Sequence, residues 1–262
     1  MRFLVPFIIL LLITSIVEIY SYQAIRTLTK NKIIRRGWTL IGVLVLLNFL
    51  FVLITTPRTA GQTKDFQWAF GFLLLNIIPK LIVLLTLLGE DIARGIKLLI
   101  RRLSKNKTHP IKGRRKFISQ LALGLAAIPF SGFLYGIIKG RHNYKVLKYE
   151  LSFKDLPEAF DGFTITQISD IHSGSFTNKE KIEYGVDLIN KQNSDLLLFT
   201  GDIVNNKATE MDEWISVFSK LKASFGKYSI LGNHDYGEYS EWNSQEEKDD
   251  NFESIKDIHP KI

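Results

Sequence analysis

Three short stretches of the sequence each end in residue types that bind metal ions in proteins. The stretches are residues 163–172, 195–202 and 227–235, and each begins with an apolar run typical of a β-strand. The polar residues that close these stretches are Asp170, His172, Asp202, Asn233, His234 and Asp235. Carboxylate, imidazole and amide groups bind divalent cations, so these positions are candidates for metal-dependent chemistry.

Each motif taken alone is a weak indication of a functional site. Asp-x-His is common at strand ends, Gly-Asp is a routine turn, and Gly-Asn-His-Asp could be a turn that leads into a helix cap. The three together are more specific, because parallel strands bring their carboxyl ends to one edge of a sheet. We therefore expect the motifs to meet at one site, where two cations could be shared.

The segments around the motifs predict alternating strands and helices. Residues 146–153 alternate between apolar and polar side chains, which predicts a strand before the first motif. Asn178 can cap a helix with Ile182 and Val186 on one face, and a second helix is expected near 210–222. Strand, helix, strand, helix, strand is the order of a parallel sheet with right-handed crossovers.

The motifs resemble the first three signature blocks of the calcineurin-like metallophosphoesterases, specifically a membrane-anchored bacterial branch of that family. The resemblance covers about residues 146–258. It implies that Asp170 and His172 bind one metal ion, that Asn233 binds another, and that Asp202 bridges the two. It also implies the fold of the family, a four-layer α/β/β/α sandwich, of which the sequence encodes a part.

The resemblance also assigns a role in proton transfer. His234 would act as general acid on the departing oxygen rather than as a ligand, and Asp235 would orient it. Two divalent ions about 3.5–4 Å apart need a carboxylate between them, and together they activate a water molecule for attack on phosphorus. The residue types favour Mn²⁺, Fe or Zn²⁺ over Ca²⁺, because imidazole suits transition metals.

One part of the family pattern is missing from the sequence. The family completes its site with an isolated His and a Gly-His-x-His block, whereas the only histidine after His234 is His259, which we expect to be an exposed tail residue. The expectation is therefore a C-terminally truncated domain with a weak or empty second metal site, unless a partner chain supplies the missing ligands. Half a sandwich would also leave one sheet face uncovered, and residues 238–253 are expected to form a mobile acidic loop.

Charge separates the chain into two unlike parts. Residues 1–145 contain 22 Lys and Arg against 4 Asp and Glu, whereas the rest contains 12 against 22. The positive charge lies between hydrophobic spans, which indicates membrane topology rather than nucleic-acid binding. The sequence contains no cysteine, so disulfides and zinc–thiolate sites are excluded.

Four apolar runs are long enough to cross a bilayer as helices. They are residues 3–20, 38–56, 69–88 and 117–138. The expected domains are therefore a four-helix transmembrane anchor at 1–140 and the α/β part at 146–262. The protein is predicted to be a multi-pass protein of the cell membrane, in contact with its lipid bilayer.

The loops between the runs predict the orientation. The first and third loops are rich in Lys and Arg and are expected to be cytoplasmic, which places the α/β part outside the cytoplasm. Residues 113–118 could be either an internal twin-arginine export signal or an ordinary basic helix cap. Residues 92–103 are predicted to form a basic amphipathic helix on the inner leaflet.

Lys80 falls in the middle of the third run, where charge is costly. Glu18 or Asn76 could be its partner. Packing within the bundle or snorkelling is the preferred interpretation, and a transport function is the alternative.

The function predicted from these features is hydrolysis of a phosphomonoester or phosphodiester at the membrane surface. The substrate could be lipid-linked or a cell-envelope precursor, because the anchor holds the site at the bilayer. The alternative is a membrane-embedded binding module without catalytic activity.

Overall fold

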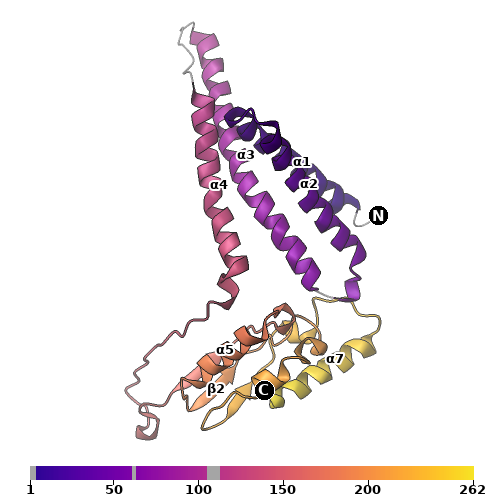
Figure 1. Ribbon diagram of the computed structural model, residues 1–262. Helices are drawn as coiled ribbons and strands as arrows, with labels where there is room; N and C mark the ends of the chain where they lie inside the picture. The colour runs from indigo at the N-terminus through magenta and orange to yellow at the C-terminus, as the bar shows by residue number, and fades with distance from the viewer. Residues whose placement is uncertain (1–3, 61–62, 105–112) are drawn as a thin grey trace. The chain divides into compact units, whose positions relative to one another are not determined.

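The computed structural model describes residues 4–60, 63–104 and 113–262, which form two compact units (Figure 1). The helical unit comprises residues up to Leu53 together with Trp68–Arg141. The α/β unit comprises Ile54–Gln67 and His142–Ile262.

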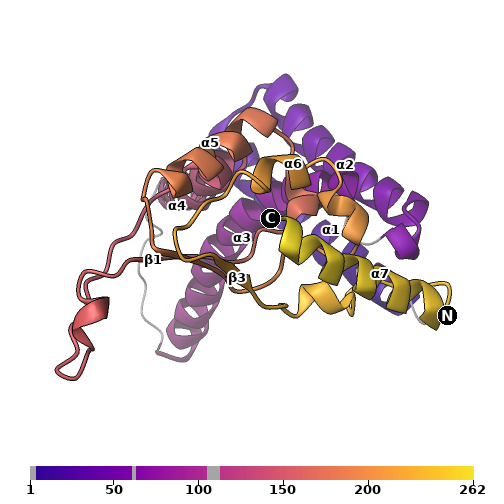
Figure 2. The same ribbon diagram turned by 90° about the horizontal axis from the view of Figure 1, so that it is seen from below.

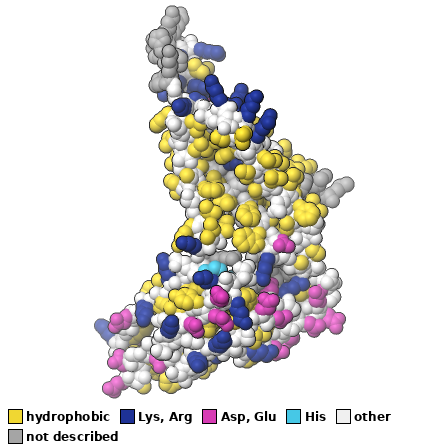
Figure 3. Space-filling model, viewed as in Figure 1, with side chains coloured by type: hydrophobic (Ala, Val, Ile, Leu, Met, Phe, Trp, Pro, Cys, Tyr) yellow, Lys and Arg dark blue, Asp and Glu magenta, His cyan; other side chains and the backbone are white. Residues whose placement is uncertain are grey.

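The helical unit contains four helices that are long and apolar enough to span a membrane. They are α1 (Leu4–Leu28), α2 (Lys32–Thr55), α3 (Lys64–Ser104) and α4 (Arg114–Ile138). Hydrophobic side chains cover the visible surface of this unit, as expected for contact with lipid (Figure 3). The four predicted spans are confirmed, with one difference. The predicted amphipathic helix at 92–103 is not a separate element, because α3 continues through it without a break.

Lys80 is buried inside this unit and forms an ion pair. Its ammonium group lies 2.7 Å from Oε2 of Glu18, and only 5% of the residue is exposed. The same ammonium lies 4.8 Å from the centre of the Trp38 ring. Gly42 makes room for the pair, because a side chain at that position would collide with the Glu18 carboxylate. Of the two partners considered for Lys80, Glu18 is therefore the one that pairs with it, and Asn76 lines a cavity of about 170 Å³ next to the pair.

A second group of charges joins α1, α3 and α4. Arg115 donates to Glu90 and Asp91, each at 2.8 Å, and to the side chain of Gln23 at 2.9 Å. Arg114 pairs with Glu90 at 3.0 Å. The twin arginines thus bind within the helical unit, as the interpretation of a basic helix cap expects.

The α/β unit is built on a parallel three-stranded sheet of order β1-β2-β3. The strands are β1 (Ile165–Ile168), β2 (Leu196–Phe199) and β3 (Lys227–Ser229). Helix α5 (Lys179–Asn190) connects β1 to β2, and a 3₁₀ turn with the short helix α6 (Ile215–Phe218) connects β2 to β3. The predicted parallel order and the Asn178 cap are confirmed, since Asn178 Oδ1 accepts from the Lys181 N–H at 3.0 Å. The helix expected at 210–222 is shorter than predicted.

One face of the sheet carries the hydrophobic core of the unit. Leu197 and Phe199 point from β2 into a buried cluster that includes residues of α5, α6 and α7 (Gln245–Ile258). Helices α5 and α6 lie along the same side of the sheet (Figure 2). The core therefore holds β2, and with it the residues that follow β2, in a fixed place.

The other face of the sheet is open, as expected. Ile165, Tyr228 and Ile230 are each more than half exposed on it. Leu198 lies between them in register with Tyr228 and is partly exposed. The expectation of an uncovered sheet face is confirmed for the described residues.

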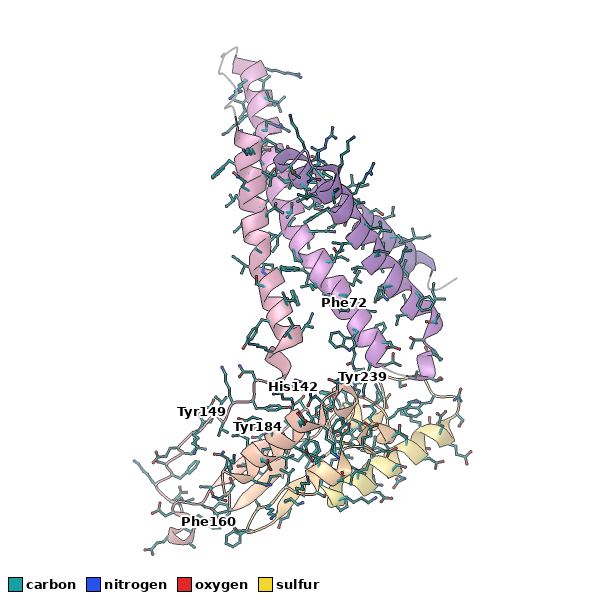
Figure 4. The ribbon with its side chains drawn as sticks, viewed as in Figure 1. Phe72, His142, Tyr149, Phe160, Tyr184 and Tyr239 are labelled. Atoms are coloured by element: carbon teal, nitrogen blue, oxygen red, sulfur yellow. The ribbon has the colours of Figure 1, made fainter. Side chains whose placement is uncertain are left out.

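Two predictions about secondary structure in the α/β unit were wrong. Residues 146–153 form no strand, because their backbone pairs with no neighbouring strand; Tyr149, for example, is 81% exposed (Figure 4). The acidic stretch 238–253 does not form the predicted mobile loop. Most of it belongs to α7, which starts at a Ser244 cap and buries Ile255 and Ile258.

His259 is not an exposed tail residue. Its ring packs 5.7 Å from that of Phe199, and its Nε2 is buried with no hydrogen-bond partner in the described chain. Burial lowers the pKa of the imidazole, and the nearby negative charge of Asp235 opposes this effect only in part.

We expect that removing one partner of the Glu18–Lys80 pair destabilises the protein, whereas replacing both partners with apolar residues does not. Glu18→Gln leaves a buried ammonium without its counter-charge, which should cost about 3–5 kcal/mol. The double variant Glu18→Leu/Lys80→Met removes both charges and should unfold near the wild-type temperature. Thermal unfolding of the purified chain in detergent measures both. A double variant as unstable as the single one would contradict this interpretation.

His259 should make the stability of the chain depend on pH. Its pKa is lower in the folded than in the unfolded chain, so the unfolded chain binds more protons between the two values. Stability should therefore fall as pH drops below about 6.5. His259→Phe should reduce this slope, measured by guanidinium unfolding between pH 5.5 and 7.5. An unchanged slope would show that other groups cause the effect.

Candidate metal centre

The three motifs meet at the carboxyl ends of the three strands. The Asp170 N–H donates to the Gly201 carbonyl, and the His172 N–H to the Asp202 carbonyl, each at 3.0 Å. The His234 N–H donates to Asp202 Oδ1 at 2.8 Å. Asp202 therefore connects the motif that follows β1 with the motif that follows β3.

Three of the predicted site residues have backbone angles that L-amino acids seldom adopt. The φ angles of Asp170, His172 and Asp202 are 53°, 47° and 60°. Among the described residues other than glycine, only Asn193 shares this feature. Such conformations cost about 1–3 kcal/mol each and are concentrated at functional sites.

The side chains of this group lie at distances suited to a shared cation. His172 Nε2 is 3.8 Å from Asp170 Oδ1 and 3.9 Å from Asp202 Oδ2. One ligand atom from each of His172, Asp202 and His234 can also be chosen so that all lie within 4.8 Å of one another. Ligand atoms bound about 2.0–2.2 Å from one zinc-sized ion stand at comparable separations. The donor set of imidazole and carboxylate groups therefore fits a divalent transition metal.

The ring of His234 is held from several sides. Nδ1 lies 2.8 Å from the backbone carbonyl oxygen of Asn205, so it carries the proton of the neutral ring and leaves Nε2 free. The ring meets that of His172 edge to face at 4.6 Å and stacks on that of Tyr239 at 4.4 Å. Nε2 can therefore bind a metal ion through its lone pair, or act as a proton donor when the ring carries a second proton.

Asn233 lies directly before the 3₁₀ turn His234–Tyr236. Its side-chain Nδ2 donates to the hydroxyl of Tyr239 at 2.8 Å. Its Oδ1 has no hydrogen-bond partner within the described chain.

Asp235 has a different task from the predicted one. It is fully buried, and its carboxylate accepts from the backbone N–H groups of residues 202–204 and Gly232 at 2.8–3.4 Å. It was expected to orient the His234 ring, but the Asn205 carbonyl has that position. Asp235 instead fastens the loop that follows β2 to the loop that follows β3.

Glu210 continues this arrangement and was missed in the sequence. Its carboxylate accepts from the N–H groups of residues 205–207 at 2.5–3.1 Å. The six consecutive backbone N–H groups of residues 202–207 therefore donate to just two carboxylates, those of Asp235 and Glu210. A signal was available, because Glu210 lies three residues after Lys207 at the start of a helical turn, the spacing of a capping box.

Two glycines allow the loops to approach this closely. A side chain on Gly201, whose φ is 99°, would collide with the backbone of Gly232. One on Gly232 would collide with the Asp202 carboxylate. The Gly-Asp and Gly-Asn-His-Asp motifs thus need their glycines for packing against each other.

Comparison with known proteins identifies similar sequences over both units. Residues 1–141 match a family model described as "Probable Calcineurin-like phosphoesterase, transmembrane domain", and residues 163–260 match one described as "Calcineurin-like phosphoesterase". No solved structure matches the chain significantly.

Several bacterial and animal proteins are similar to the chain. The metallophosphoesterase YkuE of Bacillus subtilis is 34% identical over 48% of the chain, and a transmembrane protein with a metallophosphoesterase domain from Danio rerio is 28% identical over 39%. The metallophosphoesterase Cj0846 of Campylobacter jejuni is 24% identical over 90% of the chain. The matched regions cover 46%, 24% and 60% of these relatives, respectively, so the chain spans about half of their length or less in most cases.

We expect Asp235→Asn to destabilise the α/β unit. The amide can replace only one carboxylate oxygen as acceptor, so at least one buried N–H loses its partner and the loss should be about 3 kcal/mol or more. Asp212→Asn is the matched control, since Asp212 is exposed. Tryptophan fluorescence during guanidinium unfolding compares them, and equal midpoints for the two variants would contradict the assignment.

Proposed function

Because the chain belongs to the calcineurin-like phosphoesterases that carry a four-helix transmembrane domain, we propose that it hydrolyses a phosphate ester with the help of divalent metal ions. The observation that carries the proposal is the convergence of Asp170, His172, Asp202 and His234 from three strand ends. Family membership supports metal-dependent phosphoesterase activity in general.

The proposed ligand roles follow from the contacts within the site. Asp170, His172 and Asp202 would hold one ion, and Asn233 would offer its free oxygen to a second ion that shares Asp202. Bound divalent ions supply a Lewis acid that activates water and offsets phosphate charge. Mn²⁺, Fe and Zn²⁺ suit this mixture of nitrogen and oxygen donors. Further ligands for the second ion would come from outside the described residues or from a partner chain.

In its imidazolium form, with protons on both ring nitrogens, His234 would donate the Nε2 proton to the departing oxygen and be left as the neutral ring protonated at Nδ1. The Asn205 carbonyl accepts from Nδ1–H, which leaves Nε2 as the nitrogen available for this transfer. A positioned imidazole of this kind contributes about 10²–10⁴-fold in general acid catalysis. Asp235 acts only at a distance, by holding the loop that contains Asp202.

The helical unit supports a membrane location for this activity. We propose that residues 1–140 anchor the chain and that residues 146–262 carry the site on the extracytoplasmic side, following the distribution of Lys and Arg in the loops. A site kept at the bilayer surface would suit a lipid-linked phosphate ester or another cell-envelope precursor.

We predict that Asp202→Asn strongly weakens metal binding and abolishes hydrolysis. The full chain in detergent would be titrated with Mn²⁺ and assayed with bis(p-nitrophenyl) phosphate. Loss of a shared ligand should weaken Mn²⁺ binding by about 100-fold or more, the upper end of what outer-shell changes cost. Asp257→Asn, an exposed position in α7, is the control. A wild-type chain that neither binds Mn²⁺ nor hydrolyses the ester would favour the inactive binding module.

The same measurements separate the two uses of His234. If His234→Gln keeps Mn²⁺ affinity and loses turnover, His234 is the acid. If Mn²⁺ affinity falls as far as in Asp202→Asn, His234 is a ligand.

A further inference from the structure

Tyr239 contacts two candidate site residues at once. Its hydroxyl accepts a hydrogen bond from Asn233 Nδ2 at 2.8 Å, and its ring stacks on that of His234 with centres 4.4 Å apart and planes 27° apart. It comes from the loop that follows the third motif, and Figure 4 labels it in the α/β unit.

In the structure the Tyr239 hydroxyl contacts the NH₂ end of the Asn233 amide. An amide group has an oxygen that can bind a cation and an NH₂ group that cannot. Because the NH₂ group donates to Tyr239, the oxygen is left without a protein partner. Rotating the amide by 180° would place its oxygen against the tyrosine hydroxyl and its NH₂ group where the cation would bind.

The ring contact restricts His234. The imidazole already has Asn205 at Nδ1 and the His172 ring at its side. Tyr239 covers one face of the ring, and stacked pairs of this kind are worth about 0.5–1.5 kcal/mol beyond their buried area. The direction of Nε2 is therefore set by three neighbours.

The loop that carries Tyr239 has its own supports. Gly237 has a φ of 66°, and its carbonyl accepts from Trp242 Nε1 at 2.8 Å. The Lys207 ammonium lies 5.1 Å from the centre of the Trp242 ring. Tyr239 itself is 57% exposed, so burial of its ring in the core does not explain its position.

We propose that Tyr239 is a positioning residue of the metal centre, which presents the oxygen of Asn233 to a cation and fixes the ring of His234. The first part of this proposal, that Tyr239 presents the Asn233 oxygen to a cation, is its metal half and rests on the proposed function. The second part, that Tyr239 fixes the His234 ring, is its ring half; it concerns the metal-free protein and can be tested separately.

Two substitutions separate the two contacts. Tyr239→Phe removes only the hydroxyl, and Tyr239→Leu removes the hydroxyl and the ring. Tyr228→Phe is the matched control, because Tyr228 is an exposed tyrosine on β3 and is not among the hydrogen-bond or ring partners of Asn233 and His234 in the described chain. The full chain in detergent would be titrated with Mn²⁺ by calorimetry. The ring protons of ¹³C-labelled His234 would be observed by NMR without metal, and thermal unfolding would confirm that each variant is folded.

Tyr239→Phe should weaken Mn²⁺ binding about 10-fold, as outer-shell changes do, and leave the His234 ring shifts in place. Tyr239→Leu should weaken binding at least as much and also move the His234 ring protons downfield, because the ring current is lost. Tyr228→Phe should change neither.

Wild-type Mn²⁺ affinity in Tyr239→Phe would overturn the metal half, and unchanged His234 shifts in Tyr239→Leu would overturn the ring half. Equal losses in Tyr228→Phe would show a general effect of tyrosine substitution and overturn both. Failure of the proposed function looks different: the wild-type chain would bind no Mn²⁺ at all, and the metal half would fall with it, while the NMR shifts would still decide the ring half.

Discussion

The candidate metal centre depends on a buried carboxylate that forms no ion pair with a Lys or Arg in the described chain. Asp235 is fully buried, and a buried charge is tolerated only when hydrogen bonds replace its water. Four backbone N–H groups do so, three from residues 202–204 and one from Gly232. Because those donors belong to two different loops, satisfying the charge also fixes the distance between the loops. Glu210 extends the same principle to residues 205–207 and thereby holds the carbonyl that meets His234.

This network explains how the strained backbone of the site can persist. Asp170, His172 and Asp202 all have positive φ, and relaxing any one of them would move a hydrogen bond that another loop requires. The His172 N–H needs the Asp202 carbonyl, and the Asp202 N–H needs Asp235. The cost of the three conformations is thus offset by bonds that exist only when all three are adopted. Preorganisation of this kind is what a metal site needs, because its ligands must stay in place when the ion leaves.

The convergence of the three motifs and the parallel order of the strands could be predicted from the sequence, because both follow from local pattern and from the geometry of parallel sheets. The partners of those residues could not. No sequence periodicity or motif indicates the contacts that Tyr239 and Asn205 make with His234. Asp235 follows His234 directly in the sequence, which suggested that it orients the His234 ring. At 146–153, the alternation of apolar and polar residues predicted a strand, but a strand forms only when a neighbouring strand pairs with it. At 238–253, the many charged residues predicted a loop, although part of this stretch belongs to α7, which has a buried side.

The protein stabilises buried charges either with an ion pair or with hydrogen bonds from backbone amides, and the candidate site has neither in full. In the helical unit, Lys80 is paired with Glu18. In the α/β unit, the buried Asp235 and the partly buried Glu210 accept hydrogen bonds from backbone amides. Asp202 is only 7% exposed, yet just one of its oxygens has a close donor, the His234 N–H; the other lies 3.9 Å from His172 Nε2. Asp170 approaches the same nitrogen at 3.8 Å, so two carboxylates face one imidazole. The Asp170 side chain is 66% exposed, so water solvates its charge, whereas the buried Asp202 forms no ion pair with a Lys or Arg among the described residues. A divalent cation would supply the missing counter-charge.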